Sequence, residues 1–282
     1  MDTSVHGFGR HVQTRWLRTF IGLIALVVII GPGVAEAAKK KKPKPVAPPV
    51  SDLPNYVAFQ AWQLRGKHLD ESGGIAAAIE KAVLDHMQEW FAADPARAES
   101  VTARRELERI FFNLKYPTSA KPACFDQPWK GSTLLGVGYT LSWTNYNRSN
   151  VLALFEKSAD KVRLAAVTHF MPMADLGYEF HPPVDSDDFW FFVRGTRPGK
   201  SQQRLSAVLY AFNGQELKSL WETRDAYDGR LQVGEKKVVL RYLREDEYVR
   251  EQSHGRKPPR HEATYLITPN GLELESDREI PF

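Results

Sequence analysis

Three aspartates, Asp185, Asp187 and Asp188, lie close together in the second half of the chain. Closely spaced carboxylates can hold a calcium ion or act as a general acid and base. These three lack the glycine and the distal glutamate of a helix–loop–helix calcium site, and an apolar stretch follows them. The sequence therefore favours an ordinary turn before a strand, because aspartate is common in turns.

Two of these carboxylates could nevertheless form a ligand-binding or catalytic set with nearby aromatic side chains. Glycoside hydrolases use pairs of carboxylates that need not be close in sequence, so such a site leaves no local motif. The sequence contains no Gly-x-Ser-x-Gly and no His-Glu-x-x-His. We therefore assign no catalytic residue and name four candidate ligand-binding residues: Asp187, Asp188, Trp190 and Tyr178.

Histidine spacing favours no metal site. His169 and His181 flank a Met-Pro-Met segment, and a zinc or copper site built from them is the alternative, but their separation differs from that of zinc fingers. His86 falls on an apolar helical stripe, which favours a hydrogen-bonded core histidine. Residues 195–201 lack the glycine spacing and the following helix of a phosphate-binding loop. We expect no metal and no cofactor.

The excess of positive charge belongs to the N-terminal part of the chain. The chain has 38 Lys and Arg residues against 34 Asp and Glu, and residues 1–50 hold eight of the former and two of the latter. The remainder is slightly acidic, which argues against a nucleic-acid partner. Cys124 is the sole cysteine, so no intramolecular disulfide can form.

The N-terminal residues predict export. Three arginines precede an apolar stretch, residues 20–30, and the small-x-small pattern Ala35-Glu36-Ala37 follows it. The stretch is short for a membrane-spanning helix, which needs about 20 residues. We assign residues 1–38 to a signal peptide. An uncleaved anchor is the alternative, because four lysines follow directly and oppose translocation.

Residues 39–54 are rich in Lys and Pro and predict an extended tether. The protein would then be periplasmic, attached to the cell envelope or extracellular, and it would touch the membrane only through its N-terminal segment.

Apolar residues at helical spacing follow the tether. They predict a helix over residues 75–91 and another that starts at Asp94-Pro95 and ends before Pro117, and residues 56–69 are predicted to be helical as well. The charges of residues 104–109 indicate a solvated helix face. We assign residues 55–117 to a helical segment.

Beyond residue 131 the periodicity changes to short runs typical of strands. Three stretches share a layout of a strand, a loop and a hairpin, and their middle strands begin at Val151, Ala207 and Ala263, 56 residues apart. We predict an internal repeat and one repeated antiparallel β domain over residues 131–282. The predicted strands cover residues 134–143, 151–155, 161–168, 189–194, 206–212, 217–223, 237–243, 263–267 and 272–276, with further short strands at 177–180 and 230–233.

The second stretch contains the run Leu209-Tyr210-Ala211-Phe212-Asn213-Gly214, followed by Leu217 and Leu220-Trp221. Residues 207–223 thereby resemble the blade repeat of quinoprotein-type β-propellers. The resemblance implies blade-like strand geometry, and it carries over no quinone-binding residue. Three units fall short of the four or more blades of a closed propeller. We expect a mainly β fold with an N-terminal helical segment, built from antiparallel β-meander repeats of propeller-like or sandwich-like type.

The tether, the repeats and the lack of catalytic motifs favour an exported, envelope-associated or secreted module for binding or interaction. Its loops or an open sheet edge would contact a protein or a cell-envelope polymer, and the charged stretch 244–261 predicts a long exposed loop for such contacts. The alternative is an exported hydrolase or carbohydrate-active enzyme with dispersed carboxylates. The sequence does not indicate an oligomeric state.

Cleavage after Ala37 or Ala38 would leave a mature chain that begins at Ala38 or Lys39. Mass spectrometry of the N-terminus of the protein from its native cells measures this directly. A chain that retains residues 1–37 would show that the apolar stretch is an uncleaved anchor.

Overall fold

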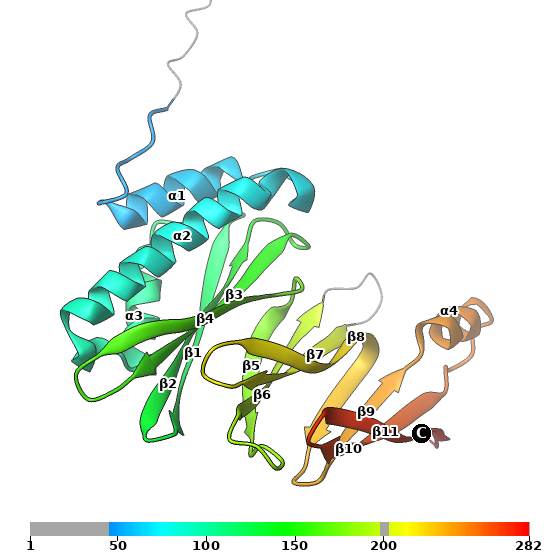
Figure 1. Ribbon diagram of the computed structural model, residues 1–282. Coiled ribbons are helices and arrows are strands. Elements are labelled where there is room, and N and C mark those ends of the chain that lie inside the picture. Colours follow the sequence, from blue (N-terminus) through cyan, green and yellow to red (C-terminus); the bar gives the residue numbers. More distant parts are fainter. Residues whose placement is uncertain (1–44, 198–202, 282) are drawn as a thin grey trace, which may run out of the picture. The chain divides into compact units, whose positions relative to one another are not determined.

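The computed structural model describes residues 45–197 and 203–281 (Figure 1). The predicted signal peptide and tether residues 39–44 lie outside the described residues. Among the helices that are described, none combines the length and the apolar character needed to cross a membrane. Val46 begins one compact unit, which continues to the end of the described residues.

Helices form the first part of this unit. Their bounds are Leu53–Gln63 for α1, Leu69–Ala93 for α2 and Ser100–Phe111 for α3, with a short 3-10 helix at Pro95–Arg97. α2 begins earlier than the predicted residue 75 and includes Gly73 and Gly74, because glycine weakens a helix without ending it. The Asp94 side chain caps only the 3-10 helix. α3 starts later than predicted, where the Ser100 amide donates to the Asp126 carboxylate at 2.9 Å.

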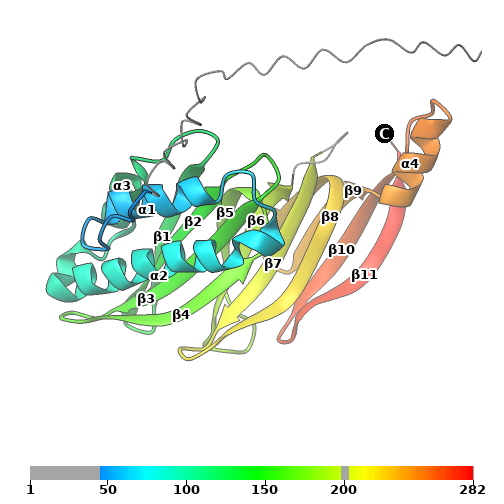
Figure 2. The same ribbon diagram turned by 90° about the horizontal axis from the view of Figure 1, so that it is seen from above.

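The described strands form two antiparallel sheets (Figure 2). Sheet A has the order β1-β2-β3-β4, with bounds Ser119–Trp129, Ser132–Ser142, Arg148–Lys157 and Val162–Phe170. Sheet B has the order β11-β10-β9-β8-β7-β6-β5. From β5 to β11 its strands span Ala174–His181, Phe189–Arg197, Arg204–Phe212, Leu217–Val233, Lys237–Leu243, Arg260–Thr268 and Gly271–Ile280.

This arrangement confirms the predicted fold class, a mainly antiparallel β-meander fold with N-terminal helices. Neither sheet closes into a barrel. The second and third predicted units share sheet B, because the long strand β8 pairs with β7 through residues 217–227 and with β9 through residues 227–233. The predicted short strand at 230–233 is therefore the end of β8.

Two elements differ from the sequence-based expectation. β1 was not predicted, because Pro122 and Pro128 disfavour strands; β1 is an edge strand of sheet A, where proline is tolerated. The stretch predicted as a long exposed loop contains a helix, α4, over Glu245–Ser253. Tyr248 anchors α4 because its buried ring packs against Tyr227, with ring centroids 5.4 Å apart.

Both faces of sheet A are covered (Figures 1 and 2). α2 lies over β3 and β4 and α3 over β1 and β2, whereas sheet B packs against the opposite face, with β5 near β1 and β8 near β4. β2 is therefore buried along most of its length. Such strands consist of nearly continuous apolar residues instead of an alternating pattern.

Two glycines of β2 let the sheets approach each other. A Cβ atom at Gly136 would lie 2.1 Å from the ring of Phe125, and one at Gly138 would lie 2.4 Å from the hydroxyl oxygen of Tyr178. Both rings belong to the core between the two sheets. Any larger residue at either position would force these packed rings to move.

Gly136→Ala should therefore lower the free energy of unfolding by about 1–3 kcal/mol, the usual cost of overpacking a core. Gly74→Ala is the matched control, because no atom lies within 4 Å of its Cβ position. In helix α2 this substitution should stabilise by roughly 0.5–1 kcal/mol. Urea denaturation measures both changes, and a Gly136→Ala variant as stable as the wild type would contradict the close contact.

Candidate functional site

The four candidate ligand-binding residues do not form one cluster. Tyr178 packs in the core between the sheets, with its ring centroid 4.8 Å from that of Phe125, while Trp190 is buried in a second core on the other face of sheet B. These two aromatic side chains therefore pack in two different cores, and ligand binding by them stays a prediction. Alternate residues of a strand point to opposite faces, and both faces of β6 are buried.

Asp187 and Asp188 lie in the loop before β6, and the Asp187 side chain is exposed. The Asp187 backbone carbonyl accepts a hydrogen bond from Trp129 Nε1 at 3.1 Å, and the Asp188 amide donates to Ser186 Oγ at 3.4 Å. These contacts are typical of a turn, which was the favoured interpretation of the three aspartates. Ligand binding by Asp187 and Asp188 stays a prediction.

His169 and His181 have separate partners. His169 Nε2 lies 2.8 Å from both carboxylate oxygens of Glu80, whereas His181 Nε2 lies 3.2 Å and 3.1 Å from the backbone carbonyls of Gly234 and Glu235. Across residues 45–197 and 203–281, no group of three or more His, Cys, Asp or Glu side chains is arranged to hold a metal ion.

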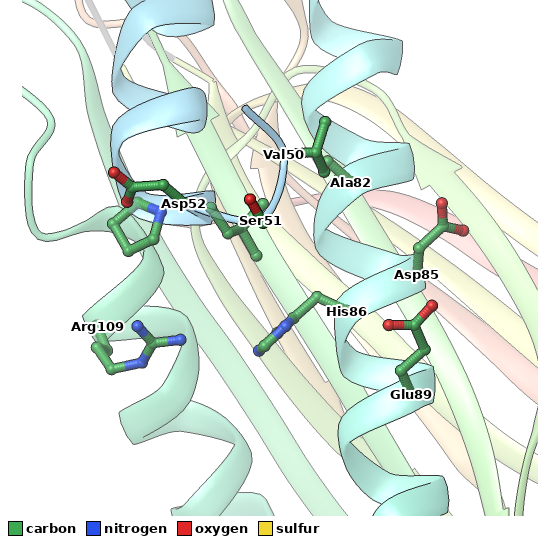
Figure 3. Close-up of a pocket in the computed structure, with 10 residues that line it drawn as sticks. Val50, Ser51, Asp52, Ala82, Asp85, His86, Glu89 and Arg109 are labelled. Carbon is green, nitrogen blue, oxygen red and sulfur yellow. The ribbon is translucent and has the colours of Figure 1, made fainter. Parts of the chain in front are cut away.

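A cavity of about 540 Å³ lies among the three N-terminal helices (Figure 3), and we call it the interhelical pocket. One wall is the end of the tether, residues 50–54, where the chain enters α1. The other walls come from α2 and α3. The lining residues are Val50, Ser51, Asp52, Leu53, Pro54, Ala82, Asp85, His86, Glu89 and Arg109.

A buried glutamate links two of these lining residues. In Figure 3, His86 on α2 and Arg109 on α3 point toward each other. Glu106 joins them: His86 Nε2 lies 2.6 Å from its Oε1, and Arg109 donates from Nε to Oε2 at 2.8 Å and from Nη2 to Oε1 at 2.6 Å. His86 is thus a hydrogen-bonded histidine, although its side chain is only partly buried.

Glu106 and Arg109 each stabilise the charged form of the other. Burial alone would raise the pKa of Glu106, but the hydrogen bonds from Arg109 and His86 outweigh burial and hold that pKa below its ordinary value. The hydrogen bond to Glu106 in turn raises the pKa of Arg109. Glu106 therefore stays ionised at neutral pH and connects α2 to α3.

The remaining charged groups of the pocket are carboxylates. Asp52, Asp85 and Glu89 are all exposed. Asp85 forms an ion pair with Lys81 at 2.5 Å, but both side chains are more than half exposed, so the pair adds little stability. Glu106 offsets the charge of Arg109 and Lys81 offsets that of Asp85, so Asp52 and Glu89 leave the pocket acidic on balance.

Sequence reasoning missed this site because it interpreted residues 104–109 as a solvated face. Glu106 is only 8% exposed. A signal was present, since position 106 lies three residues after Ala103 and four before Ile110, on the apolar stripe of α3. A glutamate on such a stripe, with Arg109 three residues later, indicates a buried ion pair.

No protein-family model, curated protein or solved structure significantly matches this chain. The resemblance of residues 207–223 to a propeller blade therefore stays a prediction. The function must be inferred from the geometry and from the sequence.

Glu106→Gln should lower the free energy of unfolding at neutral pH by about 1.5–3 kcal/mol, the range for hydrogen bonds to charged groups. A carboxylate with a depressed folded-state pKa stabilises the protein above its unfolded-state pKa, and this stabilisation is lost as the pH falls through the folded-state value. The difference between wild type and Glu106→Gln should thus shrink as the pH falls below the ordinary value of 4.5.

Urea denaturation at several pH values between about 7 and about 3 measures this difference. Glu108→Gln, an exposed position on the same helix, is the control and should change stability by less than about 0.5 kcal/mol. A deficit of Glu106→Gln that stays constant over this pH range would contradict the assigned charge state.

Proposed function

We propose that the protein is an exported, tethered binding module that takes a positively charged segment of a protein partner into the interhelical pocket. The predicted signal peptide and the Lys/Pro-rich tether support export and attachment. The acidic balance of the pocket supports a basic partner. The proposal keeps the interaction module expected from the sequence but places the contact on the helices.

The observation that carries the proposal is the engagement of Glu106 by both His86 and Arg109. His86 is the lining residue best suited to proton transfer, and Arg109 the one best suited to hold an anion. Both side chains are hydrogen-bonded to Glu106, and this contact joins α2 to α3. Recognition is thereby left to the three exposed carboxylates.

A lysine or arginine side chain fits this lining. The carboxylates attract the cationic head group, and Val50, Leu53 and Ala82 offer apolar surface to the aliphatic stem. Exposed ion pairs contribute little affinity individually. Several of them together raise the rate of association and favour a basic partner over an acidic one.

An exported hydrolase is the second candidate function, and one observation favours it. Asp85 and Glu89 lie one turn apart on α2, where Cβ atoms are about 5–6 Å from each other, so two carboxylates share one cleft. Both side chains are exposed. Because a carboxylic acid that serves as a general acid near neutral pH needs an apolar environment to raise its pKa, we rank this function below binding.

The experiment is zero-length crosslinking of the tagged full-length protein in its native cells. A carbodiimide joins carboxylates to amines, so it captures a lysine that lies in the pocket. Wild type should give recurrent crosslinks from Asp85 or Glu89 to lysines of one protein partner. In Asp85→Asn/Glu89→Gln the crosslinks to positions 85 and 89 should be lost, which leaves Asp52 as the remaining exposed carboxylate of the pocket. Recovery of the partner with a lysine-reactive crosslinker should fall several-fold.

Asp70→Asn/Glu71→Gln is the matched control, because it removes two exposed carboxylates from the same helix but outside the pocket. Equal loss of the partner in both variants would count against the pocket as the binding site. Capture of an amine-bearing polymer alone would show that the partner is not a protein. Hydrolysis of glycosidic or ester substrates that disappears only in Asp85→Asn/Glu89→Gln would favour the enzyme.

A further inference from the structure

A second cavity, of about 250 Å³, lies between the first half of α2 and the end of sheet A where β3 begins. We call it the Arg148 cavity. Its wall includes apolar side chains from the helix and the sheet, among them Ala76, Trp143 and Phe170. Small cavities with mainly apolar walls and a few polar groups are typical of ligand sites.

Arg148 is a buried cation in this wall. Its exposure is 8%, and Nη2 donates to the backbone carbonyl of Asn145 at 2.6 Å. Nε is buried without a hydrogen-bond partner, and within the described part of the chain no carboxylate forms an ion pair with this guanidinium. Burial lowers the pKa of Arg148, although the negative charge of Asp175 acts in the opposite direction. A buried charge without a counter-charge is unfavourable unless something else balances it.

Arginines at the corresponding positions of two other strands do have partners. β3, β7 and β10 begin with Arg148, Arg204 and Arg260, at the 56-residue interval seen in the sequence. Arg260 forms an ion pair with Asp228. Arg204 lies 3.8 Å from Glu245 and stacks over Tyr227, 4.4 Å from the ring centroid. Only Arg148 of these three lacks a carboxylate partner in the described residues.

Two other polar residues of the wall bear on the kind of ligand. Asn150 is 1% exposed, and its Nδ2 donates to the backbone carbonyls of Met171 and Met173, which leaves Oδ1 buried without a partner. Glu80 also lines the cavity, but His169 engages both of its oxygens. The cavity wall therefore combines an unpaired cation with an unused acceptor.

We propose that the Arg148 cavity binds a small organic acid, whose carboxylate pairs with Arg148 and whose apolar part lies against Trp143, Phe170 and Ala76. A guanidinium presents N–H donors in a fork that matches the two oxygens of a carboxylate. The volume limits the ligand to a small molecule. This site does not depend on the partner proposed for the interhelical pocket.

The test measures the thermal unfolding of the purified full-length chain with benzoate and with benzamide, which has the same ring but no charge. Benzoate should raise the unfolding temperature of the wild type with increasing concentration, and benzamide should not, because binding to the folded state stabilises it by mass action. Arg148→Met should abolish the benzoate response. Without ligand, Arg148→Met should unfold at the same temperature as the wild type or higher, because it removes an unpaired buried charge.

Arg260→Met is the matched control at the first position of β10. It should lower the unfolding temperature, because Asp228 loses its partner, and it should keep the benzoate response. Ala76→Leu is a second test variant, which fills the cavity from α2 without touching the guanidinium and should also abolish the response.

An equal response to benzoate and benzamide, or no response in the wild type, would overturn the proposal. A benzoate response that persists in Arg148→Met would do the same. If Arg148→Met unfolded at a temperature as low as Arg260→Met does, Arg148 would be a structural residue.

Discussion

The fold depends on the close contact between β2 and two aromatic rings. Gly136 and Gly138 leave the space that Phe125 and Tyr178 occupy between the sheets. With side chains in that space, sheet B could not lie against sheet A at the observed distance. The contact also explains why β2 and β3 are apolar on both faces, since the helices cover the face that sheet B leaves free.

The two cavities follow from how the helices meet each other and sheet A. Sheet B covers one face of sheet A and the helices pack on the other, and these helices leave one gap among themselves and one between α2 and the sheet. α2 forms a wall of both cavities, and Glu106 fixes it to α3. The helical layer thus brings residues from distant segments together around both cavities.

Two buried charged groups show how structural and functional roles differ. Glu106 is compensated completely, because both of its oxygens accept hydrogen bonds from a cation or a histidine, and its burial stabilises the helical layer. Arg148 donates a hydrogen bond to a backbone carbonyl, but no carboxylate of the described residues forms an ion pair with it. Burying this charge costs free energy as long as no ligand is bound. Groups that are held at such a cost are characteristic of binding sites. Glu106 and Arg148 are equally buried, so they differ in whether an oppositely charged side chain pairs with them and not in exposure.

Local patterns in the sequence determined the mainly β fold class, the helical segment and the approximate position of the strands from β2 onward, because alternation, helical spacing and turn residues act over a few neighbours. Only the tertiary structure decided that the proline-containing β1 is an edge strand, that Tyr178 packs between the sheets and Trp190 is buried, and that Glu106 meets His86. The interhelical pocket combines residues 50–54 with residues of two later helices. Such contacts join residues far apart in the chain, and they are set by which surfaces pack together, which no local pattern records.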